Sequence, residues 1–419
     1  MSLRIATVDL NGQFRGKRVP DAAVGKRANM PLSVLNLDIE GADIDGSPLV
    51  FATGDQDGVL VPYCDPVPLP WLGAARLQPA MTTTDGTTPF AGDPRQALVA
   101  VLDHYAARGQ QVIAACELEF YLLEADAAFA PALNPVTGRR LAETSILSLR
   151  EMDGFDAFFT DVEHGAQAMG LADLTITGEA GIGQFEVTLA HGPALKAADD
   201  VVLLKELIKG TARTHGMAAT FMAKPFPTES GNGLHTHFSV LNGDRNVLTD
   251  AATLGAAVAG CLDHFTQSTL IFAPFGNSFA RFVDAAHAPT SATWGYDNRT
   301  VALRIPAGPP AATRIEHRVA GGDVNPYLLF ATIFGAALDG MTRGAKPADP
   351  TDGNAYAQSG ADRLYPSLDT AITGFQAASW DGIFPPLLVE NLAMTKRQEH
   401  TRFQTYSDTD TLWKLGESV

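Results

Sequence analysis

Hydrophobic and polar positions at the start of the chain predict a β-hairpin. Leu3–Leu10 and Gln13–Pro20 have the pattern of two strands. The dipeptide Asn11-Gly12 between them suits the positive φ angles of a two-residue turn. We therefore expect the chain to open with two antiparallel strands.

Seven prolines lie between Pro62 and Pro94. Proline lacks a backbone N–H and has a fixed φ, so this stretch is predicted to contain neither a central strand nor a helix interior. We expect an extended connection that ends a small N-terminal domain, residues 1–95, and a second domain over residues 96–419.

The second part of the chain mixes predicted helices and strands without regular alternation. One helix carries both boundary signals, with Asp93 as N-cap, Pro94 at its first position and Gly109 after its last turn. A long apolar run over Gln111–Leu123 predicts a buried strand. Further along, the pattern predicts helices over Pro193–His215, Leu254–Leu270 and Asn325–Arg343, and a strand over Met217–Lys224. This order indicates an α+β fold rather than a doubly wound parallel sheet.

Composition narrows the class of protein. With 419 residues, 46% of them apolar and 18% charged, the chain is globular and long enough for a large core. A net charge of −17 argues against nucleic acid and anionic membranes as partners. The chain has no signal pattern, no apolar run of about 18 residues and only three widely spaced cysteines. We expect a cytoplasmic protein without a disulfide framework.

Two acidic pairs are the first candidates for chemistry. Glu117 and Glu119 lie two apart on the predicted strand, so both side chains project from one face. Like charges held this close need protonation, a partner or a cation. Glu179 and Glu186 flank a bend in GEAGIGQFE, where three glycines occur within six residues. The alternatives are a solvated edge strand for the first pair and a surface loop for the second.

A glycine-rich turn precedes a second cluster. It delivers His235 and His237 to one face of a following strand, with Ser239 in line, an arrangement suited to a metal or a phosphate. The alternative is a pair of structural histidines. Arginines follow at Arg299 and Arg304, and then come Arg314, Glu316 and Arg318, which share one strand face. They indicate an anionic ligand with several oxygens, unless they are solvated charges on an edge strand.

Together these groups indicate phosphoryl-transfer chemistry. Oxygen-rich ligand sets favour Mg²⁺ or Mn²⁺ over structural zinc. Cations and arginines supply the charge neutralisation that phosphoryl transfer needs. The sequence has no GxxxxGK[ST] loop and no GxGxxG after a strand, which excludes a P-loop enzyme and gives no support to a Rossmann site.

Five motifs in series resemble the glutamine synthetase superfamily over almost the whole chain: ELEF, GxGQFE, GNGLHTHFS, NRTVALRIP and RIEHRVAGGDVNPYLLFA. The stretches DLNGQFRGKRVP and APTSATWGYDNRT are similar to the gamma-glutamylpolyamine synthetase-like branch, which joins glutamate to amines. The resemblance implies a small N-terminal β-grasp domain and a catalytic domain on a curved antiparallel sheet. It also implies a homo-oligomer of stacked rings, commonly a dodecamer, whose active sites are shared between neighbouring subunits.

The resemblance assigns roles to particular residues. The metal nearest glutamate would be held by Glu119, Glu179 and Glu186. The metal bridging the ATP phosphates would be held by Glu117, His235 and Glu316. Nucleotide contacts would come from His237 and Ser239, and contacts to the phosphates and the migrating phosphoryl group from Arg299, Arg304 and Arg314. The carboxylates of the substrate glutamate would be held by Arg281 and Arg318, with backbone contact at Gly231.

The implied reaction has two steps: ATP phosphorylates the glutamate side chain, and an amine then attacks the γ-glutamyl phosphate. Members that use ammonia carry a flap glutamate where this chain has His287, flanked by Ala285, Ala286 and Ala288. Asp45 resembles the aspartate that a neighbouring subunit contributes to the ammonium site. We therefore expect an acceptor larger than ammonia, a small alkylamine or a polyamine. The alternatives are an ordinary glutamine synthetase and a catalytically silent relative.

Overall fold

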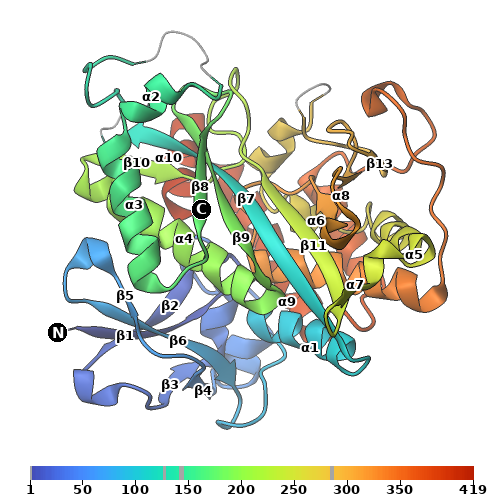
Figure 1. The fold of residues 1–419 in the computed structure, drawn as a ribbon. Helices are drawn as coiled ribbons and strands as arrows, with labels where there is room; N and C mark the ends of the chain where they lie inside the picture. The colour runs from blue at the N-terminus through green and yellow to red at the C-terminus, as the bar shows by residue number, and fades with distance from the viewer. Residues whose placement is uncertain (1, 126–128, 141–145, 284–286) are drawn as a thin grey trace.

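The computed structural model describes residues 2–125, 129–140, 146–283 and 287–419. Two β-sheets and the helices around them make up this α+β fold (Figure 1). The main hydrophobic core is continuous between the two sheets, because Val8, Leu10 and Leu77 of the smaller sheet belong to the same buried cluster as Leu118 and Leu204 of the rest. The predicted fold class is thus confirmed.

The N-terminal sheet has the strand order β2-β1-β6-β4-β3, with β5 paired to β6. Its strands are β1 Leu3–Val8, β2 Phe14–Val19, β3 Ala28–Pro31, β4 Asp57–Pro62, β5 Val67–Pro68 and β6 Arg76–Thr83. Strands β1 and β6 run parallel and the other pairs are antiparallel. The predicted hairpin is present, but its turn is longer than two residues. Asp9 N donates to Gln13 O across the turn, and Gly12 alone has a positive φ there.

The expectation that the proline-rich stretch contains no central strand is wrong. Strand β6 lies in the middle of the N-terminal sheet and contains Pro79. Pairing with β1 ends at Pro79, and pairing with β4 begins at the next residue, Ala80. The carbonyl of Pro79 still accepts a hydrogen bond from Tyr63 N. A proline is therefore tolerated where the strand changes partners.

The larger sheet has the order β13-β14-β15-β11-β7-β9-β8, with β10 on β7 and β12 on β11. Every pair is antiparallel except β13 with β14. Its strands are β7 Gln110–Glu124, β8 Leu174–Gly178, β9 Gln184–Pro193, β10 Met217–Thr220, β11 Leu234–Asn242, β12 Arg245–Asn246, β13 Trp294–Tyr296, β14 Leu303–Ile305 and β15 Ile315–His317. Strands β9, β7 and β11 cross the middle of the molecule side by side (Figure 1).

The helices are α1 Pro94–Ala106, α2 Leu149–Asp153, α3 Asp156–Met169, α4 Ala194–Thr214, α5 Ala251–Asp263, α6 Thr269–Phe272, α7 Pro326–Arg343, α8 Leu368–Ala377, α9 Pro386–Phe403 and α10 Asp408–Ser418. Asp93 caps α1 as predicted, because its side chain accepts from Arg95 N and Gln96 N. Two predicted boundaries are wrong. The expected helix over Leu254–Leu270 is two helices, α5 and α6, and the strand from Met217 ends at Thr220.

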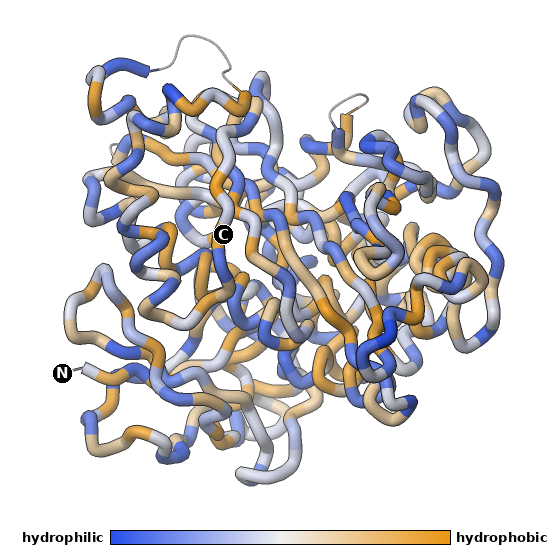
Figure 2. The backbone as a smooth tube through the Cα atoms, viewed as in Figure 1, coloured by the Kyte–Doolittle hydropathy of each residue, from blue (hydrophilic) through white to orange (hydrophobic). Residues whose placement is uncertain are grey.

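Strand β7 separates the core from the open face of the large sheet. Its even-numbered residues from Val112 to Phe120 are buried and belong to one core cluster with residues of α1 and α4. Its odd-numbered residues, including Glu117 and Glu119, lie on the opposite face. Figure 2 shows hydrophilic and hydrophobic residues interspersed along α3 and α4. None of the described helices is long and apolar enough to cross a membrane.

A buried polar junction joins the N-terminal sheet to α9. Asn11 Nδ2 donates to Glu399 Oε1 at 2.7 Å, and Lys396 Nζ donates to both Asn11 Oδ1 and Glu399 Oε2. The amide of Ile39 donates to the same Glu399 carboxylate at 2.7 Å. Because every polar group named here has a partner, the junction closes without leaving the Lys396 or Glu399 charge unpaired.

Candidate active site

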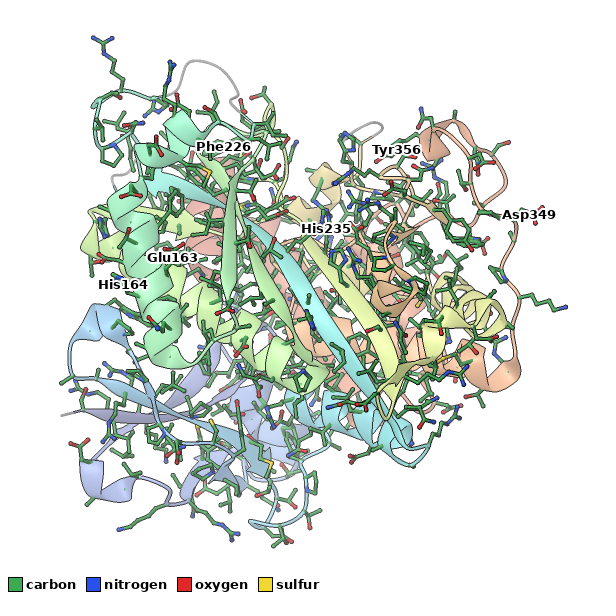
Figure 3. The ribbon with its side chains drawn as sticks, viewed as in Figure 1. Glu163, His164, Phe226, His235, Asp349 and Tyr356 are labelled. Carbon is green, nitrogen blue, oxygen red and sulfur yellow. The ribbon has the colours of Figure 1, made fainter. Side chains whose placement is uncertain are left out.

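Strand register brings the candidate residues to one face of the large sheet. Glu117 of β7 lies opposite His235 of β11, and Glu119 lies opposite Glu186 of β9. Glu316 of β15 lies opposite His237. In Figure 3, His235 lies near the centre of the molecule, between the labelled side chains of Phe226 and Tyr356. Segments 200 residues apart in the sequence thus meet at a single site.

One group of carboxylates has no cationic side chain within it. Glu119, Glu179 and Glu186 each offer an oxygen, and these oxygens lie within 4.8 Å of one another. Burial, followed by the charge of Glu119, raises the pKa of Glu179 to about 7. Burial and three neighbouring glutamates raise the pKa of Glu186 to about 8. A bound cation relieves this repulsion, so the group fits a hard divalent ion such as Mg²⁺ or Mn²⁺.

Glu117 is surrounded differently, because two histidines flank its carboxylate. Oε2 lies 3.0 Å from His235 Nδ1, and Oε1 lies 2.9 Å from His237 Nε2. Burial acts to raise the pKa of Glu117, but the hydrogen bonds from the two histidines outweigh it and hold the pKa well below the ordinary value. Glu117 is therefore ionised wherever the protein is folded near neutral pH.

The second predicted ligand set is regrouped in the structure. Glu117 and Glu316 lie within 4.8 Å of His237, whereas His235 is grouped with Glu117 and Glu186. The reason is that His237, not His235, is the register partner of Glu316 across β11 and β15. Both groups contain Glu117, and both combine carboxylate oxygens with an imidazole nitrogen. Such a mixed ligand set is less selective for Mg²⁺ or Mn²⁺ than an all-oxygen set.

Glu316 is held by two of the predicted arginines. Arg304 Nη1 donates to its Oε2 at 2.8 Å, and Arg318 Nη1 donates to its Oε1. Burial is opposed by the Arg318 charge and by the two histidines, and the net effect lowers the pKa of Glu316. Arg318 is buried, and its Nε has no hydrogen-bond partner among the described residues. This buried N–H is therefore left without an acceptor among the described residues.

The loop from Gly231 to Gly233 lies against Arg281. A Cβ at Gly231 would lie 2.8 Å from Arg281 Cγ, and one at Gly233 would lie 2.9 Å from Arg281 Nη2. Arg281 is buried, and its Nη1 donates to Val319 O at 2.6 Å. The amide of Gly233 donates to Glu119 Oε2 at 2.7 Å. Two predicted substrate-binding residues, Gly231 and Arg281, are therefore adjacent to one predicted metal ligand.

A pocket of about 790 Å³ extends along the same face from Glu117 toward the start of β7. Three predicted nucleotide or phosphate contacts line it, namely His237, Ser239 and Arg314. Arg314 Nε also lies 3.3 Å from His237 Nδ1. The remaining walls are mostly apolar and come from β7, β9, the end of β11 and the loop 309–312. A pocket of this size with charged groups at one end suits a ligand with an apolar ring and an anionic tail.

A family model described as "Glutamine synthetase, catalytic domain" matches residues 91–413. The chain belongs to the glutamine synthetase family. It is 36% identical to gamma-glutamylputrescine synthetase PuuA of Escherichia coli over 378 residues, covering 85% of this chain and 79% of that protein. It is 31% identical to glutamate–isopropylamine ligase of a Pseudomonas species over 438 residues, covering 99% and 94%. The solved apo structure of GmaS matches with a TM-score of 0.84 and 27% identity, covering 98% of this chain and 95% of that one.

Three residues that the glutamine synthetase resemblance assigns to catalysis are not joined to this cluster by a hydrogen bond. Arg299 is exposed and acts on Glu179 through its charge alone. Asp45 is exposed on the N-terminal half, where its amide donates to Gln398 Oε1 of α9 at 2.8 Å. His287 is exposed with a φ of 54°, and Ala288 beside it is buried. Ala285 and Ala286 lie outside the described residues.

The sequence analysis missed several residues of this family site. Thr188, Ala190 and His191 of β9 line the pocket, and Gln184 lies beside Glu119. The signal was present for most of them, because Gln184, Thr188 and Ala190 are spaced by two from Glu186 and so share its face of the strand. Most of these β9 residues carry no charge, and the sequence prediction rested mainly on charged residues.

Proposed function

We propose that this protein ligates L-glutamate to an amine, with ATP as co-substrate, through a γ-glutamyl phosphate intermediate. The observation that carries the proposal is that Glu117 and His237 belong both to a group able to hold a metal ion, with Glu316, and to the lining of the large pocket. ATP in the pocket would place its phosphates beside those carboxylates. The relatives named above as ligases of glutamate with putrescine and with isopropylamine support the same reaction class.

The residues divide into three roles under this proposal. Mg²⁺ or Mn²⁺ would be held by Glu119, Glu179 and Glu186 and, at a second position, by Glu117, His237 and Glu316, with His235 beside Glu117 and Glu186. The nucleotide would lie against His237, Ser239 and Arg314, with Arg299 and Arg304 reaching the phosphates. The substrate glutamate would lie at Gly231, Arg281 and Arg318.

The chemistry requires charge to be neutralised at the reacting carboxylate. A free carboxylate is a poor acyl donor, and phosphorylation by ATP supplies its leaving group. When bound, the divalent ions supply Lewis acidity and shield the phosphates from the carboxylates. Arg318, with one N–H unpartnered, and Arg281 orient the glutamate, and Arg299 and Arg304 stabilise the charge that develops on the transferred phosphoryl group.

The acceptor proposed is a small alkylamine or a polyamine. His287 stands where ammonia-using relatives carry a flap glutamate, so NH₄⁺ meets no carboxylate there. An imidazole can act as the base that takes the proton the attacking amine must lose. A homo-oligomer of stacked rings, commonly a dodecamer, would bring Asp45 of a neighbouring subunit to this amine site. The exposure of Asp45 is compatible with that role. We also propose residues 1–95 and 96–419 as the two domains and the cytoplasm as the compartment.

The test is ADP release and product formation with glutamate, Mg²⁺ and a panel of acceptors. The panel is ammonium, methylamine, ethanolamine, isopropylamine and putrescine at one pH, compared by kcat/KM. We expect one of the organic amines to exceed ammonium by a wide margin. A preference for ammonium would make the protein an ordinary glutamine synthetase, and no turnover with any acceptor would make it a silent relative.

A further inference from the structure

Gln184 is a buried polar residue to which no role in the reaction has been given so far. It is the first residue of β9, two positions before Glu186, and its side chain is 2% exposed. A buried amide of this kind loses its hydration on folding and needs partners for both its oxygen and its nitrogen. Where those partners lie indicates what the side chain holds in place.

The Gln184 amide bridges two loops. Its Oε1 accepts from Gly181 N at 2.9 Å, in the turn between β8 and β9 that starts at Glu179. Its Nε2 donates to Gly231 O at 3.1 Å and to Asn232 Oδ1 at 3.0 Å, in the loop that contacts Arg281. The same nitrogen lies 3.5 Å from Glu119 Oε2.

Hydrogen bonds to several other residues also hold the loop 231–233 in place. Asn232 is fully buried, and its Nδ2 donates to Met222 O at 2.9 Å. Its amide donates to Ala223 O at 2.8 Å. Next to it, Gly233 N donates to Glu119 Oε2. Gln184 thus contacts Glu119, the loop 231–233 and the turn before β9 with one side chain.

We propose that Gln184 is a positioning residue that sets the distance between the carboxylate group Glu119, Glu179 and Glu186 and the glutamate-binding loop at Gly231. This inference rests on the proposed function, because it takes those residues to be metal ligands and a substrate contact. Through Gln184, the glutamate side chain to be phosphorylated and the cation beside it would be held in register. Gln184 itself does not touch the reacting atoms.

The variants are chosen to separate positioning from simple support of the fold. Gln184→Met keeps the length of the side chain and removes all its hydrogen bonds. Gln184→Glu keeps the acceptor for Gly181 N but faces Gly231 O with a carboxylate. The matched control is Gln78→Met in β6, because Gln78 is 1% exposed, accepts from Gly25 N and donates to Cys64 O, far from the site in the sequence and in another sheet.

The measurements are Mn²⁺ affinity by electron paramagnetic resonance, KM for glutamate and for ATP, and thermal stability. For Gln184→Met we expect KM for glutamate to rise about 10-fold and Mn²⁺ affinity to fall about 5-fold, from the loss of the three hydrogen bonds to Gly181, Gly231 and Asn232. KM for ATP should change less than about 2-fold. For Gln184→Glu we expect the rise in glutamate KM without a loss of Mn²⁺ affinity, because a negative charge is added beside Glu119.

Different outcomes test the positioning role of Gln184 and the proposed function. If Gln184→Met behaves like Gln78→Met, with lower stability but unchanged Mn²⁺ affinity and glutamate KM, the positioning role is wrong. If Gln184→Met does not fold, Gln184→Glu decides in its place through the split between KM and Mn²⁺ affinity. If the wild-type protein turns over no amine at all, the proposed function fails, and Mn²⁺ binding still tests whether Gln184 supports the carboxylate group.

Discussion

The two sides of the candidate site differ in how the charges of their carboxylates are neutralised. On the β9 side, Glu119, Glu179 and Glu186 face one another, and repulsion and burial raise the pKa of Glu179 and of Glu186. On the β11 and β15 side, Glu117 is paired with histidines and Glu316 with arginines, and the pKa of each is lowered. The first side needs an external cation to be fully ionised, whereas the second is neutralised by the protein itself.

The difference indicates which metal position depends most on its ion. Removing the cation from the β9 side leaves mutual repulsion, while removing it from the other side leaves ion pairs already made. Metal affinity, pH dependence and mutational sensitivity should therefore differ between the two sides. The predictions below test that contrast, from the largest expected effect to the smallest.

Glu119→Ala should reduce turnover more than about 100-fold, because it removes a carboxylate from a group to which no cationic side chain of the described residues donates a hydrogen bond, and also the acceptor of Gly233 N. ADP release and Mn²⁺ affinity measure the effect. Glu163→Ala is the matched control, since Glu163 is an exposed glutamate on α3, away from His235 in Figure 3. Near-normal turnover of Glu119→Ala would remove this group from the active site.

Arg318→Lys should raise KM for glutamate about 10-fold. Lysine keeps the charge beside Glu316 but loses the Nε donor, and one charged hydrogen bond is worth about 1.5–3 kcal/mol. Steady-state kinetics with varied glutamate measure it. Arg343→Lys, in an exposed ion-pair cluster with Asp263 and Asp339, should leave KM unchanged. An unaltered KM for Arg318→Lys would mean that this side serves only to hold Glu316.

Metal-free protein should lose stability as the pH rises from about 6 to 8, and the loss should level off above that. The pKa values of Glu179 and Glu186 are raised in the folded state, to about 7 and 8, above an ordinary value of 4.5. The folded state then binds more protons than the unfolded state, so stability is highest at low pH in this window and falls as the pH passes through 7 to 8. In EDTA, Tm should fall by roughly several degrees across this pH range, and Mg²⁺ should abolish the fall.

The same pH series identifies the side responsible. Glu186→Gln removes one of the two carboxylates with a raised pKa, so its Tm in EDTA should depend less on pH than that of the wild type. Glu117 has a lowered pKa and is ionised throughout this range, so it contributes nothing to the slope. A pH profile unaffected by either Mg²⁺ or Glu186→Gln would contradict the contrast between the two sides.

His191→Ala should have the smallest effect, a rise of about 2- to 3-fold in KM for ATP. His191 is exposed at the rim of the pocket, so its loss removes one contact surface and no buried charge. KM for glutamate should not change, and the ratio of the two KM values is the measurement. A larger effect on glutamate than on ATP would mean that the pocket does not hold the nucleotide.

Patterns among neighbouring residues predicted where α1 starts and which residues of β7 share a face. Asp93 and Pro94 start α1 through a cap and a fixed φ, and the period of two along β7 placed Glu117 and Glu119 on one face. Pairing between distant strands was not encoded locally. The register of β15 on β11 decided that His237 lies opposite Glu316, and the change of partners along β6 accommodated Pro79. The spacing of Gln184 from Glu186 is a local signal, but its hydrogen-bond partners, 47 and 48 residues away, could not be predicted from it.

The buried junction of Asn11, Lys396 and Glu399 has a consequence for unfolding. The first 95 residues contain a sheet of their own, yet this polar cluster and the continuous apolar core tie that sheet to α9 and to the helices behind β7. Detaching the small sheet would remove the hydrogen bonds that Lys396 and Glu399 make with Asn11 and Ile39, and would expose Val8 and Leu77 to water. Its separate melting is therefore strongly opposed. Two sheets that are separate in topology can still unfold together in one transition. Denaturant should therefore unfold this chain as one unit.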